Sequence, residues 1–364
     1  MKITFLLPSL GLNGGNRVVS IYAEKLSNMG HQVTLVAPNV RMPSFKEKLS
    51  HYLKRPFTPL IHKYDDTFFR NRGYDIRLLE TRRAIVTSDL PDADVVIATW
   101  WETAKWMADM SHEKGEKFYF VQHNETHITI LPIDEVKATY RMDLNFITIA
   151  HWLESMLRDE YQVKKERISL IPNSVDLELF NAPPRQKNGN PTIGFLYSDT
   201  ASKGTEIAIK VCQHLRAENP NLNAICFGSP RSLKYPMPDF IELHRSPAQH
   251  SIKDIYKSCD VWLCCSTTEG FGLPVLEAMA CRTPVVSTRC GGPEDIITEG
   301  RNGFLCPVDD VDALASMVQS IFDMDNAGWT KLSNGAYEHA ASFTWDDAAR
   351  CFESALKHAL TVTV

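Results

Sequence analysis

Residues 261–277 read VWLCCSTTEGFGLPVLE, and three kinds of local structure follow one another within them. The apolar run 261–264 is typical of a short buried strand, and the Gly-Phe-Gly turn after it ends that strand. Pro274 lies where a helix would begin, at a position where its missing N–H is no disadvantage. A strand, a glycine turn and a helix in this order indicate a parallel α/β sheet.

The turn combines exposed backbone N–H groups with two carboxylates, and these two features favour different ligands. N–H groups at a helix start, together with the helix dipole, attract phosphate. Glu269 and Glu277 would repel a bare phosphate, but carboxylates accept hydrogen bonds from sugar hydroxyls. We therefore expect Glu277 to hold a ribose diol and Glu269 to contact a second sugar, so that the ligand is a nucleotide sugar. The turn would contribute Gly270, Phe271, Gly272 and Leu273.

Strand and helix patterns alternate through most of the chain. In the first half, short apolar strands alternate with helices such as the amphipathic run 15–30, which Gly30 would end. The alternation restarts after 181–191, a stretch rich in Pro, Asn and Gly that we interpret as a linker. Because both halves show this pattern, we expect an α/β protein with two tandem doubly wound, Rossmann-like domains facing each other across a cleft.

The same pattern sets the expected domain boundaries. We expect an N-terminal domain over residues 1–172 and a C-terminal domain over residues 173–344. The last amphipathic run, about 345–364, would be a helix that crosses back to the first domain. In sheets of this kind ligands bind beyond the carboxyl ends of the strands, so the motifs should follow the strands directly.

Composition excludes several classes of protein. The net charge of the 364-residue chain is −5, which argues against a nucleic-acid partner. No apolar run reaches the roughly 18 residues of a membrane-spanning helix, and the apolar run at the N-terminus stops at Pro8, so we interpret it as a first strand. The nine cysteines form no CxxC pair and several lie in apolar runs, which favours reduced thiols in a cytoplasmic protein.

The sequence motifs, taken in order, resemble the GT4 family of retaining glycosyltransferases. EGFGLPVLE, residues 269–277, resembles the family's E-x7-E element, and VSTRCGGPEDIITEGRNGFLCPVDD follows it. LPSLGLNGGNRVV, LIPNSVDLELF and SPAQHSIKDIYKSCDVWLCCS resemble other family elements in the same order. The resemblance implies a GT-B fold, a nucleotide-diphosphate sugar held mainly by the C-terminal domain, retention of configuration, and neither an essential metal nor another cofactor. It argues against a simpler interpretation in which Glu277 only complements the helix dipole and Glu269 is a solvated loop residue.

The resemblance also implies how the leaving diphosphate is neutralised. The family uses an arginine and a lysine in the first loop of the second domain, which here reads LYSDTASKGTE. Lys203 matches the lysine, but Ser198 stands where the arginine is expected. Arg17, Arg282 and Arg289 are candidates for the missing cation, and the sequence does not rank them.

In the first domain the resemblance points to one histidine and one glycine pair. His123 follows the strand FYFVQ at the family's active-site histidine position, where it would orient the donor sugar. Gly14 and Gly15 would let the backbone approach the donor phosphates or the acceptor closely. Glu125 and Arg17 are expected to contact the acceptor, which would be a glycan, a polysaccharide or a lipid-linked sugar.

A basic segment stands out in this acidic chain. Residues 41–83 contain eleven Lys or Arg against five Asp or Glu. Phe45, Leu49, Tyr52 and Leu53 recur at near-helical spacing within it, which favours a peripheral contact with an anionic membrane on its cytoplasmic face. The alternative is a solvated helical face.

Two other functions remain open from the sequence. One is a different enzyme on the same fold, such as a nucleotide-sugar epimerase or a phosphorylase. The other is a non-catalytic nucleotide-sugar-binding protein, which the serine at position 198 keeps in consideration. A nicotinamide dehydrogenase is disfavoured because no clean GxGxxG follows the first strand. The sugar, the base and the acceptor are not readable from the sequence.

Overall fold

The computed structural model describes residues 1–11, 13–39, 67–70, 72–230 and 233–362. The chain folds into two compact units. Unit 1 comprises Met1–Thr148, Glu154–Ile171 and Ala349–Val364, and unit 2 comprises Ile149–Leu153 and Pro172–Ala348.

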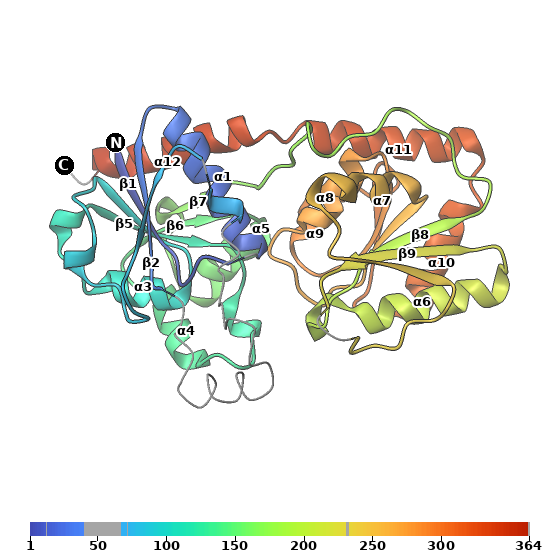
Figure 1. Ribbon diagram of the computed structural model, residues 1–364, viewed down its shortest axis with the longest axis horizontal. Coiled ribbons are helices and arrows are strands. Elements are labelled where there is room, and N and C mark those ends of the chain that lie inside the picture. The colour runs from blue at the N-terminus through green and yellow to red at the C-terminus, as the bar shows by residue number, and fades with distance from the viewer. Residues whose placement is uncertain (12, 40–66, 71, 231–232, 363–364) are drawn as a thin grey trace, which may run out of the picture. The chain divides into compact units, whose positions relative to one another are not determined.

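Unit 1 is built on a parallel sheet of seven strands within the described residues, in the order β3-β2-β1-β4-β5-β6-β7. The strands are β1 Lys2–Leu6, β2 Gln32–Ala37, β3 Asp75–Leu78, β4 Val95–Ala98, β5 Glu116–Val121, β6 Asn145–Thr148 and β7 Ile168–Leu170. The helices are α1 Gly14–Asn28, α3 Trp101–Ala108, α4 Ile133–Tyr140, α5 His151–Ser155, whose first residues belong to unit 2, and most of α12 Trp345–Val362. Helices α1 and α12 lie on one face of this sheet and α3 and α4 on the other (Figure 1).

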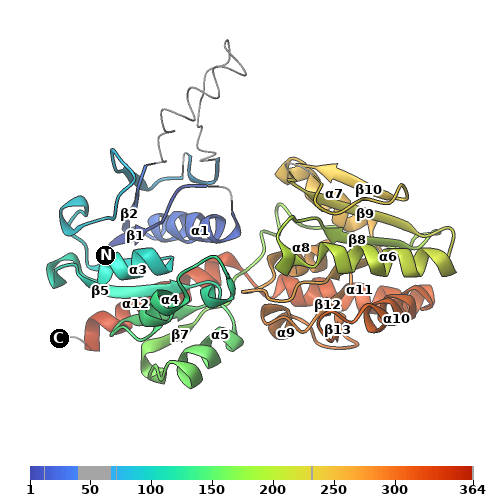
Figure 2. The same ribbon diagram turned by 90° about the horizontal axis from the view of Figure 1, so that it is seen from below.

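Unit 2 repeats this architecture with a parallel sheet that has six strands in the described part of the chain, in the order β10-β9-β8-β11-β12-β13 (Figure 2). The strands are β8 Thr192–Leu196, β9 Asn223–Gly228, β10 Ile241–Arg245, β11 Val261–Cys264, β12 Val285–Thr288 and β13 Gly303–Cys306. The helices are α6 Thr205–Glu218, α7 Ile252–Ser258, α8 Leu273–Ala280, α9 Gly292–Ile296, α10 Val311–Phe322 and α11 Asn326–Ala341. Helices α6 and α10 cover one face, while α7, α8 and α11 cover the other (Figure 1).

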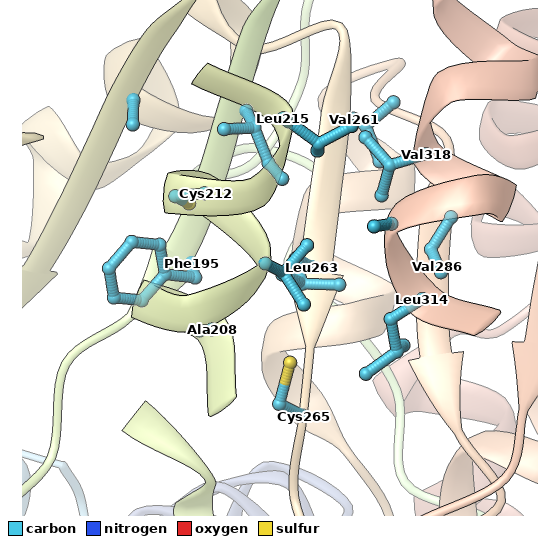
Figure 3. Packing of buried hydrophobic residues seen from close by; sticks show 14 of the residues in the cluster. Phe195, Ala208, Cys212, Leu215, Val261, Leu263, Cys265, Val286, Leu314 and Val318 are labelled. Atoms are coloured by element: carbon cyan, nitrogen blue, oxygen red, sulfur yellow. The ribbon is translucent and has the colours of Figure 1, made fainter. Parts of the chain in front are cut away.

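The core of unit 2 lies between its sheet and the helices α6 and α10 (Figure 3). Leu263, at the centre of β11, is 1% exposed and faces Leu215 and Leu314 from the two helices. Burying each such side chain contributes about 1.5–3 kcal/mol. This packing holds β8 and β11 side by side, and the loops that carry the site begin at the ends of these strands.

The core of unit 1 includes a side chain from the far end of the chain. Phe352 of α12 is fully buried, and its ring centroid lies 4.6 Å from that of Tyr22 on α1 and 5.4 Å from that of Phe120 on β5. Aromatic pairs at these separations add to the free energy of burial. Helix α12 therefore fills the face of the first sheet on which α1 packs.

The expected doubly wound α/β architecture is confirmed in each unit. Two strands were not expected: β3, an exposed edge strand, and β7, which has only three residues. The stretch 181–191 belongs to unit 2, where Lys187 donates to the carbonyls of Phe322 and Met324. It is therefore not the linker expected from its composition.

Three further expectations concern the cysteines, membrane-spanning helices and the basic segment. None of the nine cysteines is in a disulfide, and all but Cys264 and Cys351 are buried. No helix within the described ranges is long and apolar enough to cross a bilayer. Most of the basic segment 41–83, including the apolar positions expected to face a membrane, lies outside the described residues.

Candidate functional site

Two loops meet where the strand order of the second sheet changes direction. From β8 the chain runs through α6 to β9 on one side, and from β11 it runs through α8 to β12 on the other. A ligand site is expected at such a point, beyond the carboxyl ends of the two strands. The loops are in close contact, because Thr267 N–H donates to Ser202 O at 2.8 Å. A Cβ on Gly204, where φ is +65°, would lie only 1.8 Å from Cys265 O, so this approach requires glycine.

An ion pair joins these two loops. Lys203 Nζ donates to both carboxylate oxygens of Glu269, at 2.7 and 2.8 Å, and Ser266 Oγ donates to Glu269 Oε1 at 2.7 Å. The Glu269 side chain is 10% exposed and that of Lys203 is 33% exposed. Burial by itself lowers the pKa of Lys203, but the charge and hydrogen bonds of Glu269 offset it and hold that pKa above its usual value. The lysine is therefore cationic and shares its charge with the carboxylate.

The start of α8 lies beside this ion pair. Gly272, the residue before the helix, has φ +95° and ψ 46°, and Pro274 follows at the second helical position. A small pocket in unit 2 is lined by Lys203, Glu269, Gly272 and Pro274 among others. Phe271 is buried and Leu273 is half-buried, and the Gly270 carbonyl accepts a hydrogen bond from Trp152 Nε1 at 3.0 Å. Here a helix N-terminus lies next to a lysine.

Glu277 lies one turn into α8 and is 5% exposed. Its Oε2 accepts a hydrogen bond from the Tyr256 hydroxyl on α7 at 3.0 Å. The structure thus places Glu277 and Glu269 on the same helix start, one within α8 and one before it. Holding a ribose diol, the role expected from the sequence, remains a prediction for Glu277.

The loop at Ser198 is closed by neutral hydrogen bonds. Ser198 N–H donates to Thr205 Oγ1 at 2.9 Å, and that hydroxyl donates back to Ser198 O at 2.8 Å. Arg282, a candidate for the missing cation, lies just past the C-terminal end of α8 and donates to Ala182 O and Asn334 Oδ1. Arg289 is exposed at the end of β12 and pairs with Glu299 at 2.7 Å. The third candidate, Arg17, belongs to unit 1.

In unit 1 the glycine pair lies at the carboxyl end of β1. Asn16 shapes the loop before it, because its side-chain amide donates to Ser9 O at 3.1 Å and to Gly11 O at 2.9 Å. A Cβ on Gly14 would meet no atom within 4 Å, whereas one on Gly15 would lie 3.4 Å from Gln122 Nε2. The glycine loop therefore contacts the segment that carries His123. Arg17 follows on α1 and is half-buried.

His123 follows β5 at the same edge of the first sheet. The side chain is half-buried, and Nδ1 lies 2.9 Å from the carbonyl oxygen of Asn124. If Nδ1 carries the proton in that contact, Nε2 is left as the acceptor. This is consistent with a histidine that accepts a hydrogen bond from a hydroxyl.

Glu125 is the most enclosed carboxyl group of the candidate residues, at 2% exposure. Its Oε2 accepts from Trp101 N–H at 2.9 Å and its Oε1 from the Tyr119 hydroxyl at 2.9 Å. Burial raises the pKa of Glu125 to about 8, despite these two hydrogen bonds, which lower it. Both oxygens are engaged inside unit 1, so the expected contact with an acceptor would require this network to open.

Three residues of the site went unnoticed in the sequence: Ser266, Tyr256 and Trp152. Ser266 could have been noticed, because it stands three residues before Glu269 in a loop that follows a strand. Tyr256 and Trp152 reach the site from distant segments, and no local pattern marks them. Within the described ranges no group of three or more His, Cys, Asp or Glu side chains could hold a metal ion.

Two family models match this chain, one over each half. The model described as "Glycosyltransferase Family 4" matches residues 12–179, and the one described as "Glycosyl transferases group 1" matches residues 178–339. Among curated proteins, the chain is 27% identical over 219 residues to a D-inositol 3-phosphate glycosyltransferase of Stackebrandtia nassauensis, covering 53% of this chain and 49% of that protein. A protein of the same name from Paenarthrobacter aurescens is 31% identical over 217 residues, covering 53% and 52%. The chain thus spans about half the length of the curated relatives it matches.

Solved structures extend the likeness of the fold over the whole chain. Sucrose-phosphate synthase from Thermosynechococcus elongatus has a TM-score of 0.75 at 17% identity, covering all of both chains. Anabaena HepE, solved in complex with UDP-glucose, has a TM-score of 0.72 at 17% identity, covering 98% of this chain and 100% of that one. At these identities the likeness establishes the fold alone.

Proposed function

Because the chain belongs to glycosyltransferase family 4, we propose that it transfers a sugar from a nucleotide-diphosphate sugar to a glycan, polysaccharide or lipid-linked acceptor. The observation that carries this proposal is the ion pair between Lys203 and Glu269 beside the N-terminus of α8. A cation and a helix N-terminus suit a diphosphate, and carboxylates suit sugar hydroxyls. Few other ligands combine both.

The leaving group would be stabilised by unit 2. As the bond between sugar and phosphate breaks, negative charge grows on the diphosphate, and Lys203 and the backbone N–H groups at Gly272 and Leu273 would stabilise it. Glu269 would accept hydrogen bonds from the donor sugar and Glu277 from the ribose. The fixed Lys203–Glu269 pair means that the cation is positioned before the substrate arrives.

Unit 1 would supply the acceptor side and part of the sugar contact. We propose that His123 hydrogen-bonds a hydroxyl of the donor sugar and that the loop at Gly14 and Gly15 approaches the phosphates or the acceptor. Transfer would occur with retention, with the leaving phosphate oxygen taking the proton from the acceptor hydroxyl. This route asks the protein mainly to stabilise charge and to orient the two substrates.

Binding and transfer can be tested separately. Thermal unfolding is measured with UDP, GDP, ADP and dTDP sugars, since a ligand at about 100 times its Kd stabilises a protein by about 2.7 kcal/mol. The stabilising sugar is then offered with an acceptor panel that includes D-inositol 3-phosphate, the compound in the names of the relatives, and the anomer of the product is assigned by NMR. Binding without transfer or donor hydrolysis would favour a non-catalytic binding protein, and an inverted product would contradict retention.

We further propose that the basic segment 41–83 attaches the enzyme to the cytoplasmic face of an anionic membrane. The support is the composition of the segment, which has eleven cations and only five anions. Each cation near an anionic leaflet contributes about 1 kcal/mol to the binding free energy. We expect sedimentation with phosphatidylserine vesicles at low salt and release at high salt. Neutralising Lys46, Lys48, Lys54 and Arg55 together should abolish sedimentation and leave nucleotide-sugar binding intact. Failure of the wild-type protein to bind such vesicles at low salt would contradict this attachment.

A further inference from the structure

Two cations that follow strands of the second sheet are already paired with carboxylates among the described residues. Lys203 gives both of its observed side-chain contacts to Glu269, and Arg289 pairs with Glu299. A nucleoside diphosphate would bring about two to three negative charges to this edge. A further cation there would therefore strengthen binding, provided that no carboxylate already neutralises it.

Lys234 meets that description. It lies in the loop between β9 and β10, and β9 neighbours β8, so this loop emerges at the same edge as the loop of Lys203. Lys234 Nζ donates to Asp199 O at 3.3 Å, directly after Ser198. The amine thus reaches the backbone of the β8–α6 loop from the opposite side to the β11 loop that carries Glu269.

Contacts of the neighbouring Tyr235 help to fix the place of this lysine. Tyr235 N–H donates to the Tyr197 hydroxyl at 3.2 Å, and the two rings meet edge to face at 6.5 Å between centroids. A Cβ on Gly228 would lie 2.2 Å from Tyr197 O, so the ends of β8 and β9 are closely packed. Lys234 Nζ also lies 5.1 Å from the centre of the Tyr235 ring. Tyr235, the residue next to Lys234, is therefore anchored to Tyr197 at the start of the β8–α6 loop.

The charge of Lys234 is not cancelled by an ion pair. Among the described residues it makes no salt bridge, and its observed partner is a neutral carbonyl. Lys234 contributes to lowering the pKa of Glu206 in the first turn of α6, but the larger cause is Lys210, which binds Glu206 at 2.8 Å. The lysine is exposed, so a ligand can reach it.

We propose that Lys234 is a phosphate-binding residue of the sugar-donor site. It adds positive charge to this site, where the charge of Lys203 is shared with Glu269. This inference rests on the proposed function, since it needs a diphosphate ligand at this edge. The ligand chemistry is a nucleoside diphosphate, with the phosphates beside the Ser198–Asp199 backbone. Lys234 would move from the Asp199 carbonyl to a phosphate oxygen, which is the stronger acceptor.

The test compares the affinity for a nucleoside diphosphate with the affinity for the same nucleoside without phosphates. Kd is measured by calorimetry for UDP, GDP, ADP and dTDP, and the tightest of these is compared with its nucleoside. Lys234→Ala should raise the Kd of the diphosphate about tenfold at low salt and leave that of the nucleoside unchanged. Lys234→Arg should restore most of the affinity because it keeps the charge. Lys257→Ala is the matched control, since Lys257 is an exposed lysine of unit 2 that already pairs with Asp254.

The outcomes separate this inference from the function beneath it. If the wild-type protein binds a diphosphate and Lys234→Ala binds it equally well, the role of Lys234 is overturned while the proposed function stands. Equal losses for the diphosphate and the nucleoside would also overturn it, because the lysine would then support the loop and not a phosphate. If the wild-type protein binds none of the four diphosphates, the proposed function fails and this inference fails with it.

Discussion

Each unit buries a glutamate just after a strand, but the two carboxyl groups are stabilised in different ways. Glu269 in unit 2 forms an ion pair with Lys203, which donates to both of its carboxylate oxygens. Glu125 in unit 1 has no ion pair with a described residue and is bound by a backbone N–H and the Tyr119 hydroxyl. Its pKa is accordingly raised to about 8, chiefly by burial, so near neutral pH it holds a proton.

The difference teaches what each carboxyl group can do. Glu269 is ion-paired beside a pocket, where it positions the lysine, and we expect it to accept hydrogen bonds from a ligand. Glu125 joins the turn after β5 to the start of α3 through Trp101 N–H, which supports the segment that carries His123. We therefore expect Glu269 to belong to a binding surface and Glu125 to support such a surface from beneath.

The largest effect is expected when Lys203 is replaced by methionine. If Lys203 stabilises the leaving group as proposed, removing this cation should lower kcat roughly 100- to 1000-fold, by analogy with the loss of one charge-stabilising group elsewhere. It should also leave Glu269 buried without its counter-ion. Because Lys203 is one-third exposed, we expect a loss of about 2 kcal/mol in the free energy of unfolding, less than for a fully buried pair. Steady-state kinetics and urea denaturation measure the two effects.

The double variant Lys203→Met with Glu269→Gln separates the two losses. It should recover most of the stability, because no uncompensated charge remains, but none of the activity. Recovery of activity in the double variant would show that Lys203 serves only to neutralise Glu269.

A smaller, pH-dependent effect is expected for Glu125→Gln. The folded protein keeps the Glu125 proton up to about pH 8, whereas the unfolded chain loses it near pH 4.5. Between these values the native state binds more protons, so the wild-type free energy of unfolding should fall by up to about 1.4 kcal/mol per pH unit from this group. Glutamine stays neutral and can still accept from Trp101 N–H. The stability of the variant relative to wild type should therefore rise by about 2–3 kcal/mol between pH 6 and 8.

Urea denaturation of both proteins at pH 6, 7 and 8 measures this slope. Glu113→Gln is a suitable control, since Glu113 is an exposed carboxylate of unit 1. A constant difference between Glu125→Gln and wild type across this range would mean that Glu125 is ionised in the folded protein.

The smallest effect is expected for Glu277→Gln. A charged hydrogen bond to the ribose would weaken by about 1.5–3 kcal/mol, which raises the Kd of the nucleotide sugar by at least about tenfold. The bond from Tyr256 can be accepted by the new amide oxygen, so the melting temperature without ligand should barely change. Calorimetry and thermal unfolding give the two values. Unchanged nucleotide affinity would remove Glu277 from the site.

Sequence alone predicted the architecture because local signals agree with it. The apolar runs at β1, β4 and β11 are buried on both faces, so each of these strands can be recognised from its own sequence alone. Strand β3 was not predicted because all four of its residues are exposed at a sheet edge, so the sequence has no apolar pattern there. Strand β7 was not predicted because its three residues are too few to show the alternation of apolar and polar residues that is typical of a strand.

The candidate site was predictable in part for the same reason. Lys203 and Glu269 were named because each follows a strand in a recognisable loop, but their ion pair depends on two strands being neighbours. The environment of Glu125 depends on Trp101 and Tyr119, and burial of a carboxyl group by distant residues leaves no local mark. The separate roles of the two glutamates were therefore visible only in the fold.

Helix α12 has a consequence for the order in which the chain is completed during synthesis. Phe352 fills the core between Phe5, Tyr22 and Phe120, yet about 180 residues separate it from β7, the last strand of that sheet. At the usual 5–20 residues per second, the ribosome needs on the order of 10–40 s to cross this interval. The first unit to leave the ribosome therefore waits with an unfilled aromatic core while nearly all of the second unit emerges. Nascent unit 1 is thus the part expected to recruit chaperones, and the unit made later is the first able to close its core.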